Sequence, residues 1–108
     1  MKKTLNKKVD KQIVKDNFLY KRPDVMLFSK EQWSYIRKRY KITVRELEIS
    51  MLICSGLSSK EIARELHIEK GTVKIHTRNV YRKVCVKNRI LLLLRFMDDI
   101  NRFFGQSG

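Results

Sequence analysis

The spacing of apolar residues predicts a series of short helices from residue 29 onward. Ser29 can cap a helix over 30–40, with Gln32 at the capping-box position and Trp33 and Ile36 on one face. No segment alternates apolar and polar residues between Asn-Gly or Asp-Gly turns, as paired strands do. The pattern therefore predicts an all-α fold.

Two further helices are predicted to begin with capping boxes. Thr43 and Glu46 form the first box, and Gly56 is expected to end that helix in the left-handed conformation. Ser58 and Glu61 form the second, at the start of a helix of barely three turns. Two helices joined by a tight turn, the second with a basic face, are typical of a helix-turn-helix.

A longer helix starts near Lys70 or Thr72 and has two different faces. Its core face is expected to hold Val73, Val80 and Val84. Four basic residues at i, i+4 spacing form a neighbouring face: Lys70, Lys74, Arg78 and Arg82. Stacked like charges weaken an isolated helix by a few tenths of a kcal/mol per pair. The lack of acidic partners favours an external anion over an ordinary solvated surface.

The last predicted helix, after Asn88, carries more apolar residues than a small domain readily covers. One stripe has alternating spacings of three and four: Ile90, Leu93, Met97, Ile100 and Phe104. A second strip contains Leu92, Phe96 and Phe103. The double width favours a seam for self-association, and the alternative is that the stripe is the core face of the helix.

The net charge of the chain indicates a polyanionic partner. The 108 residues include 25 Lys and Arg against 11 Asp and Glu, a formal charge of +14. Most of the excess lies in residues 1–23 and 69–89. Nucleic acid is the first expectation and an anionic membrane surface the second. No apolar run is long enough to span a bilayer and no signal-peptide core follows Met1, so a cytoplasmic location is expected.

The chain is expected to hold one domain preceded by an arm. Residues 1–28 form the basic N-terminal arm, 29–41 the short preceding helix and 42–108 the helix-turn-helix domain. For the arm, a solubility tail, a DNA-tracking arm and a short helix packed on the domain remain open. The aromatic residues Trp33, Tyr35 and Tyr40 are expected to pack in the core rather than to stack on bases.

Neither a metal site nor an enzyme is predicted. Cys54 and Cys85 have no Cys or His at zinc-ligand spacing, so both are expected to be reduced, buried packing residues. His67 and His76 also lack ligands at suitable spacing, and His76 is expected to pack or to lie near a phosphate. No catalytic arrangement or phosphate-binding glycine loop is present, and no cofactor or small-molecule ligand is indicated.

At these residues the chain resembles the LuxR-type DNA-binding domain, also called NarL/FixJ or GerE-type, over about residues 42–96. The resemblance rests on four stretches: ITVRELEI at 42–49, GLSSKEIAREL at 56–66, TVKIH at 72–76 and NR at 88–89. It implies a four-helix domain from a bacterial transcription regulator, in which the second and third helices bind DNA and the fourth mediates dimerisation.

The resemblance also implies roles for particular residues in binding double-stranded DNA. Base contacts fall on Lys74, Ile75 and Arg78, since basic side chains donate to guanine and an apolar tip contacts a thymine methyl group. Contacts to phosphates are expected from a larger set: Ser58, Ser59, Lys60, Lys70, Thr72 and Arg82. The implied complex is a homodimer on a pseudo-palindromic operator.

The sequence departs from the family pattern at two positions, and a second class of function stays open. Ser50 replaces an apolar residue, and Glu69 replaces the Ser or Thr that usually caps the recognition helix. The N-terminal 41 residues match no receiver or ligand-binding domain. The alternative function is an adaptor whose C-terminal helix binds RNA polymerase or another regulator.

Overall fold

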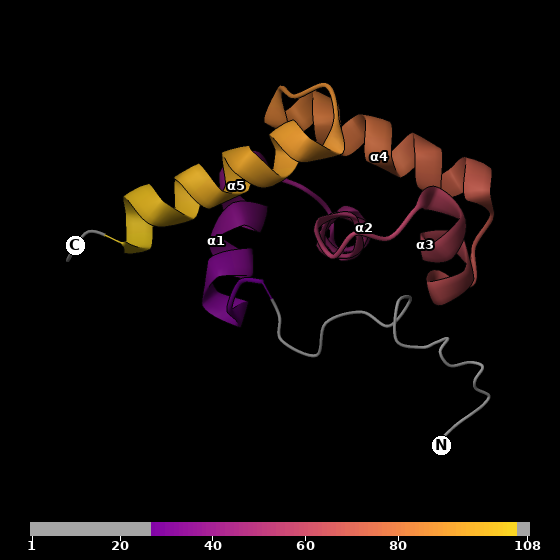
Figure 1. Ribbon diagram of the computed structural model, residues 1–108, viewed down its shortest axis with the longest axis horizontal. Coiled ribbons are helices and arrows are strands. Elements are labelled where there is room, and N and C mark those ends of the chain that lie inside the picture. The colour runs from indigo at the N-terminus through magenta and orange to yellow at the C-terminus, as the bar shows by residue number, and fades with distance from the viewer. Residues whose placement is uncertain (1–26, 106–108) are drawn as a thin grey trace, which may run out of the picture.

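The computed structural model describes residues 27–105, which form helices joined by short turns (Figure 1). They are α1 (Lys30–Tyr40), α2 (Val44–Cys54), α3 (Ser59–Leu66), α4 (Lys70–Val84) and α5 (Arg89–Phe104). No strand occurs within this range, so the predicted all-α class is confirmed. The proposed arm, residues 1–28, lies outside the described residues except for its last two.

The predicted capping boxes are confirmed at the starts of α1, α2 and α3. The hydroxyl oxygens of Ser29, Thr43 and Ser58 accept hydrogen bonds from backbone amides three residues later, at 3.1, 3.1 and 3.2 Å. These bonds satisfy amides that have no partner within the helix. Gly56 has a φ of 92°, in the left-handed region that glycine adopts without strain, as predicted.

The helices are arranged around α2, which Figure 1 shows end-on near the centre. α3 and α4 lie on one side of it, α1 lies on the other, and α5 runs from the end of α4 across α1. Each of these helices contributes buried side chains to one core. Ile36, Ile49, Ile62, Val80 and Phe96 are at most 1% exposed, which ties α1 to the other four helices.

Aromatic rings join α1 to α5. The Trp33 ring lies 5.0 Å from Phe28 and 5.8 Å from Phe96, both in edge-to-face geometry. Farther along α5, Tyr35 stacks on Phe103 with ring centroids 4.2 Å apart. The expectation that the aromatic residues of the first helix pack in the domain is confirmed for Trp33, which is 4% exposed.

A buried carboxylate completes the contact between α1 and α5. Asp99 is 5% exposed, accepts a hydrogen bond from the Tyr40 hydroxyl and forms an ion pair with Arg39 at 3.4 Å. Burial, together with this hydrogen bond, raises the pKa of Tyr40, so its hydroxyl remains a donor. These contacts supply the partners that a buried charge needs.

The prediction for the cysteines is wrong at one position. Cys54 is half-buried, and burial raises its pKa to about 12. Cys85 is exposed, because it follows the last residue of α4 with a φ of 64° and turns the chain toward α5. The neighbouring Val84 is fully buried, so the apolar stretch around Cys85 indicated burial that applies only to its neighbour.

Candidate nucleic-acid interface

A three-residue turn sets α4 against α3. His67 ends α3 with a φ of 57°, and the Ile68 amide donates to the Ala63 carbonyl at 3.0 Å. Glu69 then occupies the N-cap of α4, and its side chain makes no capping hydrogen bond. The departure from Ser or Thr at this position therefore leaves α4 without a side-chain cap, as its sequence suggests.

The two predicted faces of α4 are present in the structure. Val73, Val80 and Val84 are 0% exposed and pack in the core, which confirms the inward face. On the outside, the helix exposes four basic residues and one isoleucine: Lys70, Lys74, Arg78, Arg82 and Ile75. The core valines thus fix which side of α4 can meet a ligand.

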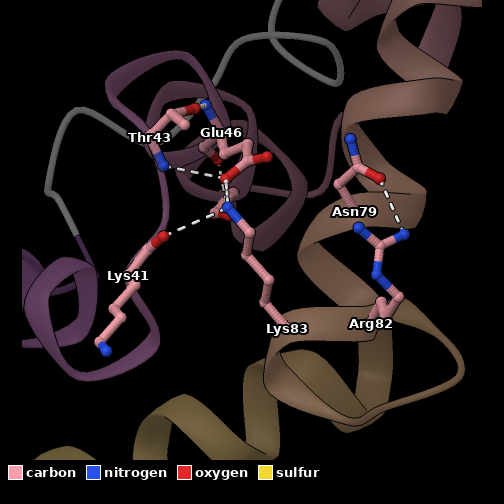
Figure 2. A network of polar contacts seen from close by, with 7 residues as sticks. Lys41, Thr43, Glu46, Asn79, Arg82 and Lys83 are labelled. Atoms are coloured by element: carbon pink, nitrogen blue, oxygen red, sulfur yellow. Dashed lines mark hydrogen bonds and ion pairs between the residues drawn. The ribbon is translucent and has the colours of Figure 1, made fainter.

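The outward charges of α4 are largely unneutralised. Within residues 27–105, Lys70, Lys74 and Arg78 have no ion pair or side-chain hydrogen bond. Ile75 lies among them with 52% of its surface exposed. Arg82 donates to the Asn79 side chain at 3.1 Å, which orients it along the helix, and it stays exposed (Figure 2). The surface is cationic with one apolar tip, a combination that suits the major groove.

The start of α3 offers further polar groups. Ser58 is exposed, and its hydroxyl accepts from the Glu61 amide while keeping its own proton to donate. Lys60 is exposed as well, whereas Ser59 and, at the start of α4, Thr72 are half-buried. Free backbone amides at a helix N-terminus add to this capacity to bind phosphate.

Lys83 has a role that the sequence analysis did not identify. Its Nζ lies 2.7 Å from Glu46 Oε1 on α2 and donates to the Lys41 carbonyl at 3.2 Å (Figure 2). Glu46 Oε1 also accepts from the Thr43 amide at 2.9 Å, and the Glu46 side chain is only 6% exposed. Lys83 therefore holds α4 to the start of α2, and no local pattern signals a pair 37 residues apart.

The environment of Glu46 favours its charged form. Burial opposes ionisation, but hydrogen bonds from Lys83 and the Thr43 amide outweigh it, so the pKa of Glu46 is lowered from its ordinary 4.5. Nearby, Ser50 is fully buried and its hydroxyl donates to the Glu46 carbonyl at 2.8 Å. The Glu46 carbonyl thus gives the buried Ser50 hydroxyl a hydrogen-bond partner, at a position where the family usually has an apolar residue.

Replacing Lys83 with methionine should lower stability without removing a DNA contact. We expect the free energy of unfolding to fall by about 1–3 kcal/mol, because Glu46 is left buried without its cation. Urea denaturation measures this loss. For Lys83→Met, the slope of log K against log salt for DNA binding should stay unchanged. For Arg82→Met, the magnitude of this negative slope should fall by about 0.9. A reduced slope for Lys83→Met would place Lys83 on a phosphate.

The same pair gives a pH dependence. Because the folded pKa of Glu46 is lowered, its stabilisation is complete above the ordinary value of 4.5 and is lost as pH falls through the folded pKa. Glu46→Gln keeps the capping box but not the ion pair. Denaturation at pH 7 and pH 3 should show the variant less stable at pH 7 and the gap closing at pH 3. A constant gap would contradict this account.

Other chemistry has little support in the described part of the chain. No group of three or more His, Cys, Asp or Glu side chains there could hold a metal ion. His76 is half-buried on α4, and within residues 27–105 its Nδ1 has no hydrogen-bond partner. None of the described helices combines the length and hydrophobicity needed to cross a membrane.

Comparison with known proteins agrees with this surface. The model for the family described as bacterial regulatory proteins, luxR family, matches residues 41–95, just over half of the chain. The match contains α2, α3 and α4 and the first part of α5. It leaves out α1 and the last turns of α5. No solved structure gives a significant match.

Relatives with established descriptions are longer regulators. The nitrate/nitrite response regulator protein NarP of Escherichia coli is 40% identical over 58 residues, which are 54% of this chain and 27% of NarP. The CsgBAC operon transcriptional regulatory protein of Escherichia coli is 41% identical over 61 residues, 56% of this chain and 28% of the relative. The transcriptional regulatory protein LnrK of Bacillus subtilis is 44% identical over 48 residues, 44% and 22% of the two chains.

The chain spans about a quarter of the length of these relatives, and the region that the family model matches contains α2, α3, α4 and the first part of α5. Their descriptions as regulators agree with the expectation of a regulator rather than an enzyme. The capped helices, the buried valines of α4 and its basic outer face are the features that this region contributes. The chain therefore belongs to the luxR family of bacterial regulatory proteins, with its DNA-binding helix-turn-helix domain at residues 41–95.

Proposed function

We propose that this protein regulates transcription by binding a specific, pseudo-palindromic DNA sequence as a homodimer, with α4 in the major groove. The observation that carries the proposal is the outer face of α4, where Lys74, Ile75 and Arg78 are exposed. Neither cation has an ion-pair partner within residues 27–105. The core valines on the opposite face hold the helix in place, so these side chains can face DNA without rearrangement of the fold.

The contacts divide into two kinds. Lys74 and Arg78 donate to guanine edges and Ile75 meets a thymine methyl group, which gives sequence preference. Phosphates are bound by the remaining polar and basic groups around the turn: Ser58, Ser59, Lys60, Lys70, Thr72 and Arg82. Phosphate contacts position the protein and carry most of the salt dependence.

Self-association occurs through α5, on a stripe that differs from the predicted one. Ile90, Met97 and Phe104 are 66, 45 and 40% exposed and remain in the proposed surface. Ile100 is 8% exposed and belongs to the core of its own chain, and Leu93 is half-buried. Leu94, at 53% exposed, completes the stripe instead. Because Leu92 and Phe96 point into the core, the exposed face of α5 includes Leu94 rather than Leu93.

The test is selection of bound sequences from random double-stranded DNA by the full chain. We expect two half-sites related by a dyad and separated by a fixed spacing. Light scattering of the free protein and of its complex gives the number of copies. A single half-site bound by one copy would overturn the proposed dimer. In that case an adaptor that binds RNA polymerase or another regulator through α5 becomes the better function.

A further inference from the structure

A shallow groove lies where the end of α5 meets the start of α1. Its volume is about 530 Å³, and Phe28, Met97, Ile100 and Phe104 supply its apolar lining, with Gln32 and Asn101 among its polar groups. Every residue that lines the groove lies outside the family match at 41–95. The matched residues by themselves therefore do not form the groove.

The charge of the groove suits a second copy of the same chain. The chain as a whole carries a formal charge of +14, so most faces of two copies repel each other. The groove lining contains no Lys or Arg, and its one acidic residue, Asp98, is already paired with Arg102 at 3.0 Å. A largely apolar, nearly neutral surface is the place where two such chains can approach each other.

A stable dimer also needs more buried area than the matched part of α5 offers, and the groove can supply the rest. A specific interface buries about 800 Å² on each partner, or roughly 20–30 residues a side. Within the matched part of α5, the large apolar side chains left exposed are Ile90, Leu91 and Leu94. Three side chains supply too little area. Met97 and Phe104, which are 45 and 40% exposed, extend the same apolar surface into the groove that they line.

The spacing along α5 determines which residues an antiparallel pair would bring together. Ile90 lies seven residues before Met97, and Phe104 lies seven residues after it. Residues seven apart share a helix face. An antiparallel pair of α5 helices with Met97 on the two-fold axis therefore places Ile90 of the partner subunit opposite Phe104 and the groove.

We infer that the groove between α1 and α5 is one half of an isologous interface, which receives Ile90 of the partner subunit when two α5 helices pair antiparallel about Met97. This inference rests on the dimer proposed above and gives it a geometry. It also assigns a function to the start of α1, since Gln32 lies in its first turn and Phe28 directly precedes its N-cap. Each partner contributes both the groove and the side chain that fills the other groove, as two-fold symmetry requires.

Cross-linking of chains that carry one introduced cysteine tests the geometry. The variants are Ile90→Cys, Met97→Cys and Phe104→Cys, each with Cys85→Asn because asparagine tolerates the left-handed conformation. Cys54 can remain, since burial raises its pKa to about 12 and makes it a poor nucleophile. With a short bismaleimide, we expect Met97→Cys to link to itself and Ile90→Cys to link to Phe104→Cys in a mixture.

Each other outcome of the cross-linking overturns the inference. Links of Ile90→Cys to itself and of Phe104→Cys to itself would show parallel helices, which leaves a dimer but not this groove contact. No link in any combination would show that α5 does not pair in this way. The dyad in the selected DNA is measured separately, so failure of the geometry is distinguishable from failure of the proposed function.

Sedimentation equilibrium of two matched variants tests whether the groove belongs to the interface. Phe104→Asp should weaken self-association at least 10-fold, because it places a carboxylate against an apolar side chain of the partner. Phe103→Asp is the control, since Phe103 is 58% exposed on the same turn, stacks on Tyr35 and does not line the groove. Circular dichroism verifies that both fold. If Leu94→Asp weakens the dimer and Phe104→Asp does not, α5 pairs without the groove and the inference is wrong.

Discussion

Arg78→Ala is expected to weaken binding to the selected DNA sequence by about 1–3 kcal/mol, roughly 5- to 150-fold, and to relax the preference at one base position in each half-site. The reason is that Arg78 is exposed on the outer face of α4, within residues 27–105 it has no ion pair, and a bidentate arginine distinguishes guanine from the other bases. Fluorescence anisotropy with the selected site and its single-base variants measures both effects.

Arg37→Ala is the matched control for this experiment. Arg37 is exposed on α1, on the other side of α2 from α3 and α4 (Figure 1). The control removes the same charge from a surface that does not face the proposed DNA, so it should change affinity by less than about 2-fold. If Arg78→Ala and Arg37→Ala behave alike, or if the Arg78 variant selects an unchanged sequence, Arg78 does not read a base.

Trp33→Ala is expected to have the largest effect on stability, about 3–5 kcal/mol. Trp33 is 4% exposed and lies between Phe28 and Phe96 at the junction of α1 with α5. Domains are stable by only about 5–15 kcal/mol, so this loss removes a large share of the total. Urea denaturation followed by circular dichroism measures the change, and a single transition is expected because α1 shares the core of the other helices.

Phe103→Ala serves as the comparison, since Phe103 is 58% exposed and makes its ring contacts near the surface. Its removal should cost about 1 kcal/mol. Separate transitions for α1 and the remaining helices would show that α1 is an attached segment rather than part of one cooperative unit. A loss of less than about 1 kcal/mol in the free energy of unfolding for Trp33→Ala would lead to the same conclusion about α1.

Local patterns were sufficient for much of the candidate site. Capping boxes fix helix starts through contacts three residues apart, so Ser29, Thr43 and Ser58 could be assigned from the sequence. The inward face of α4 followed from Val73, Val80 and Val84 for the same reason, since helical periodicity determines which side chains share a face. The outward face, with Lys74 and Arg78, was then determined as well.

Long-range contacts were not accessible in this way. The charge count placed Lys83 in the basic block of α4, yet the fold pairs it with Glu46, 37 residues away. Asp99 is adjacent to Asp98 in the sequence, but the former is buried against Tyr40 and the latter is paired with Arg102. The contact of Lys83 with Glu46 and that of Asp99 with Tyr40 depend on how α2 and α1 pack on the other helices. No local spacing encodes this packing.

The sequence by itself determined the helices, their caps and the basic face of the α4 helix, because these depend on residues within one or two turns of each other. Tertiary structure alone decided which stripe of α5 remains exposed. Trp33 and Tyr40 of α1 pack against Phe96, which is buried, and Ile100 is buried as well. The exposed face consequently lies along Ile90, Leu94, Met97 and Phe104. A helix with apolar residues on several sides has no unique inward face until its neighbours are in place.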